Sequence, residues 1–128
     1  MASAASKAAE TAKSAKNTVI YHNPTCSTSR KTLELLRDSG LEPTIVEYLK
    51  TPPSRDELVA MIRDAGIDVR GAVRTREPLY GELNLADASE EQLLDAMAEH
   101  PILIERPFVV TPKGTRLARP VDMVREIL

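Results

Sequence analysis

The sequence predicts one α/β domain built on a mixed sheet, with a β-α-β unit first, a β-β-α unit last and a helical insertion between them. Three observations favour this class. A β-prone run at residues 18–21 turns directly into an amphipathic helix, a strand-turn-strand pattern lies near the C-terminus, and the middle has helix-capping sequences instead of strand patterns. With 128 residues, 42% hydrophobic and 28% charged, the chain has the composition of a globular domain, which we assign to residues 18–128.

The first unit begins with the apolar run at 18–21 and turns at Asn23-Pro24. The helix that follows spaces its leucines for burial and should end near Ser39-Gly40, and residues 44–49 read as a second strand. Parallel strands joined by a helix place ligands beyond the carboxyl ends of the strands. Cys26 follows the first strand at that edge.

The helical insertion, residues about 52–100, starts after Pro52-Pro53. Two capping-box sequences, at 54–57 and 89–92, predict helices, whose inward faces carry Leu58, Met61, Ile62, Leu93, Leu94 and Met97. Between them, residues 69–76 are short and basic and predict another helix, and residues 78–84 predict a turn-rich link. We expect this section to contain only helices and loops.

The last unit reads as strand 107–110, tight turn 111–114 and strand 115–118, which is an antiparallel hairpin. Pro120 suits the first turn of a final helix, whose apolar positions are Val121, Val124, Ile127 and Leu128. The summed order, β-α-β, helices, β-β-α, is typical of a thioredoxin-like domain.

Composition excludes several kinds of function. Residues 1–17 are mostly Ala, Ser and Lys and predict a disordered leader or a vector-derived sequence. The longest apolar runs are too short to cross a bilayer, and a formal net charge of −2 argues against general nucleic-acid binding. A single cysteine excludes an internal disulfide, a four-cysteine zinc site and a Cys-x-x-Cys pair, and no two-histidine metal pattern is present, so we expect no metal and a reducing, cytoplasmic location.

Cys26 is the candidate nucleophile because a thiolate at a helix N-terminus is stabilised by unpaired backbone amides and the helix dipole. Arg30, one helical turn further on, should help to keep the thiol ionised. The alternative is an inert buried cysteine, which is the commoner situation. The flanking Thr25, Ser27, Thr28 and Ser29 form a poor core environment and disfavour it.

Arg74, Arg106 and Arg119 are the candidate oxyanion ligands. Arg106 and Arg119 flank the hairpin and can emerge at one sheet edge, and a guanidinium beside apolar strands needs an anion or a carboxylate partner. The alternative is that these arginines are solvated or paired with Asp and Glu. A thiolate beside an arginine clamp predicts substitution at the central atom of a tetrahedral oxyanion. Phosphatases that use Cys-x5-Arg are disfavoured, because Arg30 follows Cys26 by four residues.

The chain also resembles the glutaredoxin-linked arsenate reductases of thioredoxin-like fold. The resemblance extends from about Thr18 to the C-terminus and depends on four motifs, at residues 21–30, 52–58, 100–107 and 114–120. It implies that Cys26 attacks arsenate, that Arg74, Arg106 and Arg119 bind the oxygens, and that His22 keeps the thiol ionised. It also implies glutathione as co-substrate, glutaredoxin as partner, no bound cofactor, and a cis peptide bond before Pro107.

Three points in this interpretation stay open. His22 can equally make a structural hydrogen bond at the end of a strand. Residues 75–78, after Arg74, differ from the usual run of the family. A glutathione-dependent thiol reductase, or a redox regulator of the same fold, is the alternative to an arsenate reductase; such regulators carry a Cys-x-x-Cys switch, whose second position is Ser29 in this chain.

Overall fold

A mixed sheet is the centre of the computed structural model, which describes residues 18–128; the leader predicted at 1–17 lies outside the described residues. Within the described range the sheet has the strand order β2-β1-β3-β4. The strands are β1 (Val19–His22), β2 (Thr44–Glu47), β3 (Phe108–Thr111) and β4 (Gly114–Leu117). β1 pairs parallel with β2 and antiparallel with β3, and β3 pairs antiparallel with β4. The predicted mixed, thioredoxin-like sheet is confirmed.

The strand register brings four chain segments to one edge of the sheet. His22 aligns with Glu47, Tyr21 with Phe108, and Phe108 with Leu117. The carboxyl ends of β1, β2 and β4 therefore meet the amino end of β3. The segments leaving these ends carry Cys26, Tyr48, Arg119 and Arg106.

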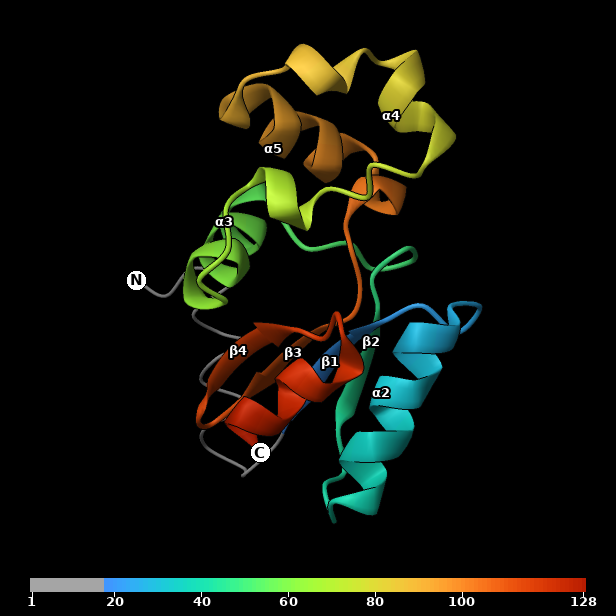
Figure 1. Cartoon of the computed structure of the whole chain (residues 1–128), viewed down its shortest axis with the longest axis vertical. Helices are drawn as coiled ribbons and strands as arrows, with labels where there is room; N and C mark the ends of the chain where they lie inside the picture. The colour runs from blue at the N-terminus through green and yellow to red at the C-terminus, as the bar shows by residue number, and fades with distance from the viewer. Residues whose placement is uncertain (1–17) are drawn as a thin grey trace.

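The two faces of the sheet are covered by different helices (Figure 1). α2 (Ser27–Asp38) and the 3-10 helix η4 (Val121–Ile127) cover one face, where a core cluster includes Ile20, Leu36, Val109 and Val124. The second core cluster joins the opposite face to the helical section, through Tyr21, Phe108, Leu58, Leu93 and Met97. Alternate residues of β1 and β3 point to opposite faces, so each strand contributes to both clusters.

The helical section contains α3 (Arg55–Asp64), α4 (Pro78–Glu82) and α5 (Glu90–Glu99). Both predicted capping boxes are confirmed: Ser54 caps α3 reciprocally with Glu57, and Ser89 caps α5 reciprocally with Gln92. α3 and α5 pack against each other, and Arg55 forms ion pairs with Glu91 and Asp95 across them. No helix among residues 18–128 combines the length and the apolar character that crossing a membrane requires.

Several element predictions were wrong in detail. The helix predicted at 69–76 is one 3-10 turn, η1 (Arg70–Ala72), because Val73 instead forms an antiparallel bridge with Ile104. That bridge also contradicts a section made only of helices and loops. The link predicted at 78–84 is mostly α4, since a proline at the first helical position is preorganised for a helix. The final helix is 3-10, and two further 3-10 turns are η2 (Leu85–Asp87) and η3 (Pro101–Leu103).

Candidate active site

Cys26 is the N-cap residue of α2, held there by a tight turn after β1. Its backbone N–H donates to the Asn23 carbonyl at 3.0 Å, and its own carbonyl accepts from the Arg30 N–H at 3.0 Å. The Asn23 side-chain oxygen accepts from the Thr25 N–H at 3.0 Å and from the Thr25 hydroxyl at 2.8 Å. This network places the partly exposed Cys26 at the sheet edge described above.

The thiol of Cys26 has a lowered pKa. Burial is the largest single influence and raises the pKa, but the backbone N–H of Ser29, the positive charge of Arg106 and the backbone N–H of Thr28 together outweigh it. The Arg106 side chain thus favours the thiolate chiefly through its charge. Amides of the first helical turn and a neighbouring cation are the groups that make a cysteine a nucleophile near neutral pH.

His22 contacts the first turn of α2 through Ser29. The histidine is 6% exposed, and its Nδ1 lies 2.6 Å from the Ser29 hydroxyl, which also accepts from the Asn23 N–H at 3.0 Å. Burial lowers the pKa of His22, opposed by Glu47 and assisted by Arg37 and Arg30. The contact observed is the structural one, to Ser29, and the role of His22 in keeping the Cys26 thiol ionised stays a prediction. The groups that lower the pKa of Cys26 are Ser29, Arg106 and Thr28.

Ser29 is more buried than the sequence analysis expected. It is fully buried, although we grouped it with the flanks that make a poor core environment. The available signal was its spacing of three residues from Cys26, since the amide at the third helical position faces the N-cap. The Arg30 guanidinium donates to the Pro24 carbonyl at 3.0 Å and so braces the turn, while its effect on the thiol stays a prediction.

Arg106 and Arg119 meet at the same edge as Cys26, as the hairpin flanks predict. Arg106 is 6% exposed, and Arg119 donates from Nη1 to the Arg106 carbonyl at 3.1 Å. The peptide bond between Arg106 and Pro107 is cis, as the resemblance implies, and the bond between Arg119 and Pro120 is cis as well. Arg106 thus lies close enough to Cys26 for its charge to lower the pKa of the thiol, and Arg119 is anchored to the Arg106 backbone.

Arg74 reaches the site through the bridge that the sequence did not reveal. The Arg74 backbone N–H donates to the Leu103 carbonyl at 2.7 Å, next to the Val73–Ile104 bridge. Arg74 therefore lies alongside the segment that leads to Arg106. Its side chain pairs with Glu77 at 3.2 Å. The charges of Arg106 and Arg74 lower the pKa of the buried Tyr48 phenol and that of Cys26 raises it, while burial remains the main cause of its raised pKa.

Three functional candidates were missed by the sequence argument. Tyr48 follows β2, is 2% exposed and has a raised pKa, chiefly because of burial, so the phenol keeps its proton. Glu105 is a buried carboxylate paired with Arg76, Arg106 and Arg119. The signal for Tyr48 was its place at the carboxyl end of a strand parallel to β1; for Glu105 and Arg76 only long-range contacts identify the cluster.

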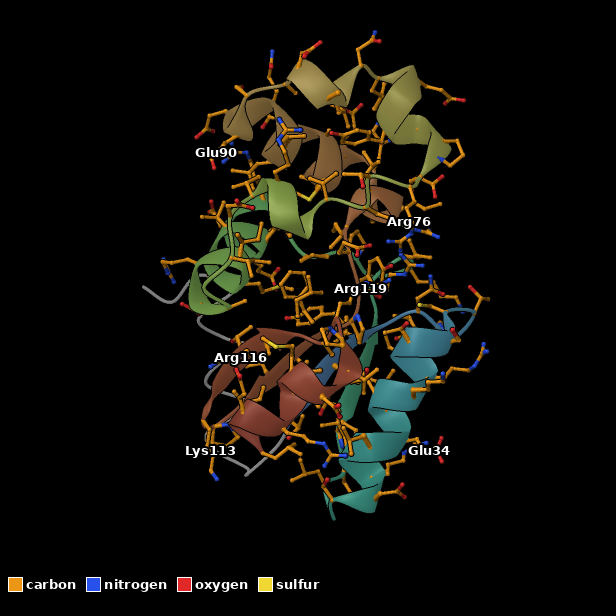
Figure 2. All side chains as sticks on the ribbon, in the orientation of Figure 1. Glu34, Arg76, Glu90, Lys113, Arg116 and Arg119 are labelled. Atoms are coloured by element: carbon orange, nitrogen blue, oxygen red, sulfur yellow. The ribbon has the colours of Figure 1, made fainter. Side chains whose placement is uncertain are left out.

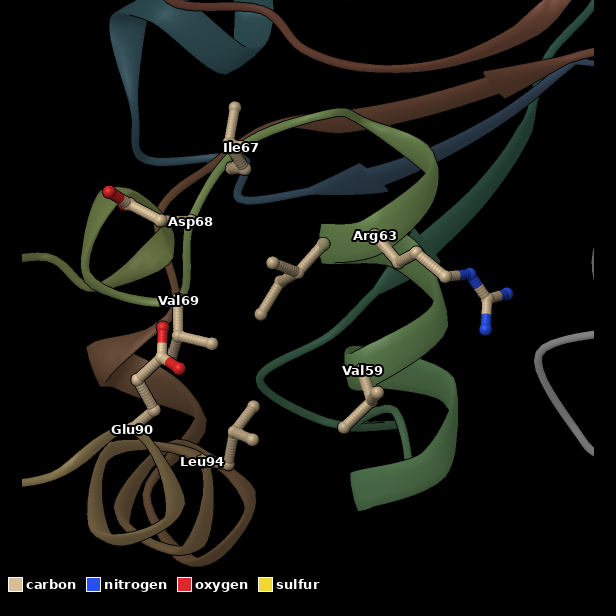
Figure 3. Close-up of a pocket in the computed structure, with 8 residues that line it drawn as sticks. Val59, Arg63, Ile67, Asp68, Val69, Glu90 and Leu94 are labelled. Atoms are coloured by element: carbon tan, nitrogen blue, oxygen red, sulfur yellow. The ribbon is translucent and has the colours of Figure 1, made fainter.

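A separate cavity lies between α3 and the start of α5 (Figure 3). Its walls are apolar: Val59, Ile62, Ile67, Val69 and Leu94. Arg63, Asp68 and Glu90 also line it, and the lining includes none of the predicted site residues. Within residues 18–128, no group of three or more His, Cys, Asp or Glu side chains is arranged to hold a metal ion.

Comparison with known proteins gives consistent matches. The model of the ArsC family matches residues 21–127. An arsenate reductase of Rhizobium meliloti (strain 1021) is 61% identical over 111 residues, covering 85% of this chain and 79% of that protein. An arsenate reductase of Escherichia coli (strain K12) is 58% identical over 114 residues, covering 88% and 81%. A solved arsenate reductase from Vibrio cholerae superimposes with a TM-score of 0.84 at 50% identity, covering 89% of this chain and 99% of that one.

Proposed function

The chain belongs to the ArsC family, and on this premise we propose that it is an arsenate reductase that reduces arsenate to arsenite through a covalent adduct on Cys26. The observation that carries the proposal is the lowered pKa of Cys26 at the start of α2, to which the charge of Arg106 contributes. The same guanidinium that favours the thiolate can also bind the oxygens of an oxyanion that the thiolate attacks. A second arginine, Arg119, is anchored to the Arg106 backbone beside it.

In the first step, the Cys26 thiolate attacks arsenic and an S–As bond forms, while an As–O bond breaks and one arsenate hydroxyl takes a proton from solvent and leaves as water. Arg74, Arg106 and Arg119 hold the remaining oxygens and stabilise the negative charge that builds up on them. Arg74 and Arg106 support this role because each has a buried Nε–H with no acceptor among the described residues. Buried donors normally have partners, and an oxyanion supplies acceptor atoms.

The remaining steps need thiols from other molecules, because the sequence contains one cysteine. Reduction of As(V) to As(III) takes two electrons, which two thiols provide by forming one disulfide. Glutathione joins the arsenic adduct, its sulfur bonds to that of Cys26, and the S–As electron pair stays on arsenic, which leaves as arsenite. A glutaredoxin thiol then reduces the Cys26–glutathione disulfide. A reducing, cytoplasmic location suits this sequence of steps.

The test is arsenite production by the purified protein supplied with arsenate, glutathione and glutaredoxin. We expect turnover that depends on both reductants and is abolished in C26S, which keeps the size of the side chain but removes the nucleophile. Absence of arsenite with both reductants present rejects the proposal. Turnover of a glutathione mixed disulfide without any turnover of arsenate would instead support the glutathione-dependent thiol reductase.

A further inference from the structure

Among residues 18–128, Glu105 is the side chain that pairs with both Arg106 and Arg119. Its Oε2 lies 2.9 Å from Arg119 Nε, and its Oε1 lies 3.4 Å from Arg106 Nη1 and 3.5 Å from Arg76 Nη2. Glu105 is 8% exposed, so its charge is largely removed from water. Figure 2 shows Arg76 nearer to the helical section and Arg119 nearer to the sheet, and Glu105 pairs with both.

The backbone of Glu105 is also held by a hydrogen bond. Its N–H donates to the Ala72 carbonyl at 2.8 Å, next to the Val73–Ile104 bridge. The carboxylate is therefore attached to a paired segment, and it is not free to follow the arginines. A buried carboxylate on a paired segment can influence where a guanidinium lies, because an ion pair that is removed from water is strongly attractive.

Arg119 is the arginine that depends most on this contact. Two of its three nitrogens have partners: Nε pairs with Glu105, and Nη1 donates to the Arg106 carbonyl. Together these contacts restrict the orientation of the guanidinium, and among residues 18–128 no hydrogen bond from Nη2 is found. Arg106 depends less on Glu105, because its own pairing is longer and its side chain is 7% exposed and packed in place.

We propose that Glu105 is a positioning residue, which sets the orientation of the Arg119 guanidinium for an oxyanion bound at Cys26. The inference rests on the proposed function for the identity of that oxyanion, and it assigns Glu105 no contact with the substrate. Glu105 therefore affects arsenate binding through Arg119. Replacing Glu105 should change arsenate binding much less once Arg119 has been removed.

The test measures how arsenate protects Cys26 from alkylation by iodoacetamide in the absence of glutathione, so that no turnover is required. The variants are E105Q, R119A and the double variant E105Q/R119A. We expect E105Q to raise the half-protecting arsenate concentration about tenfold, the size expected for losing one charge-assisted contact. In the R119A background the same change should have an effect below about twofold, because the two residues act as one unit. E105D, which keeps the charge on a shorter side chain, should lie between wild type and E105Q.

A control is E126Q, because Glu126 also pairs with an arginine Nε, that of Arg116 at 2.8 Å, but on the exposed surface, and Arg116 lies lower in Figure 2 than Arg119. E126Q should leave protection unchanged. The inference is overturned if the half-protecting arsenate concentration of E105Q/R119A rises by the product of the two single-variant changes. Normal protection in E105Q overturns it as well. If E105Q does not fold, wild-type protection in E105D overturns it equally. Wild-type protection without arsenite production rejects the proposed function alone, whereas absence of protection in the wild type rejects the inference.

Discussion

At the scale of single residues, Arg106 and Arg119 differ in what they do for the site. Arg106 acts on the Cys26 sulfur and on Tyr48, whereas Arg119 is held by Glu105 and by the Arg106 carbonyl. Removing each arginine should therefore give a different result. Removing Arg106 should change both the thiol pKa of Cys26 and the binding of the oxyanion. Removing Arg119 should change mainly the binding of the oxyanion.

We expect R106Q to raise the pKa of the Cys26 thiol, because the variant loses the positive charge that favours the thiolate. The measurement is the rate of alkylation by iodoacetamide as a function of pH. R116Q, which changes an arginine on β4 paired with Glu126, is the matched control and should leave the curve in place. An unchanged thiol pKa in R106Q would show that the first turn of α2 alone activates Cys26.

We expect R119A to raise the KM for arsenate by about tenfold or more, as loss of a charge-assisted contact predicts, while the thiol pKa changes little. R106A should raise KM to a similar extent and also slow the alkylation of Cys26 near neutral pH. Steady-state kinetics with glutathione and glutaredoxin in excess give KM, and the alkylation rate gives the second quantity. Equal arsenate dependence in wild type and both variants would contradict the oxyanion clamp.

At the scale of elements, the helical section begins its two longest helices with the same device. Ser54 accepts from the Glu57 N–H at 3.1 Å, and Ser89 accepts from the Gln92 N–H at 3.2 Å. In each box the side chain at the third helical position accepts from the serine backbone N–H. Each helix start therefore has two satisfied backbone donors, which fixes where α3 and α5 begin.

S54A and S89A should each lower the free energy of unfolding by about 1 kcal/mol, the typical cost of losing an N-cap side chain. Both caps are exposed and distant in sequence from Cys26, so arsenate turnover at low temperature should not change. Denaturant titration followed by circular dichroism gives the stability. S39A is the comparison: its hydroxyl donates to the Leu35 carbonyl at the end of α2 instead of capping a helix start, so its effect should be smaller.

At the scale of the whole molecule, the buried His22 makes stability depend on pH. Burial, the main cause, lowers its pKa in the folded state, so the unfolded state binds the proton more readily. The contribution of neutral His22 is fully present above the unfolded-state pKa of about 6.5 and is lost as pH falls toward the lower folded-state value. Stability should therefore decline below about pH 6.5 in the wild type.

The test compares wild type with H22N, whose amide can still approach the Ser29 hydroxyl but does not titrate in this range. Denaturant midpoints between about pH 5 and pH 7.5 should fall more steeply for wild type than for H22N, because only the wild type takes up this proton on unfolding. Parallel curves for the two proteins would mean that His22 has the same pKa in both states. The carboxylates, which titrate mainly below this range, are common to both proteins and cancel in the comparison.

Local sequence patterns predict much of the architecture. The run before Cys26, the capping boxes at Ser54 and Ser89, and the turn at 111–114 each specify their element from neighbouring residues, and all are present in the structure. The thioredoxin-like order followed from these, as did the location of Cys26 at a helix start. The middle section was harder, because Val73 pairs with a residue 31 positions away and Pro78 starts a helix in a segment whose composition suggests a turn.

By itself, then, the sequence determined the fold order, the place of Cys26 at a helix start and the arginines that border the hairpin, since each depends on interactions between near neighbours. Only the tertiary structure decided which groups surround Cys26. The thiol receives its stabilisation from Ser29, Thr28 and Arg106, while His22 and Arg30 brace the turn. Glu105 and Tyr48 enter the site through strand register and through the Val73–Ile104 bridge, and such long-range pairing has no local signature.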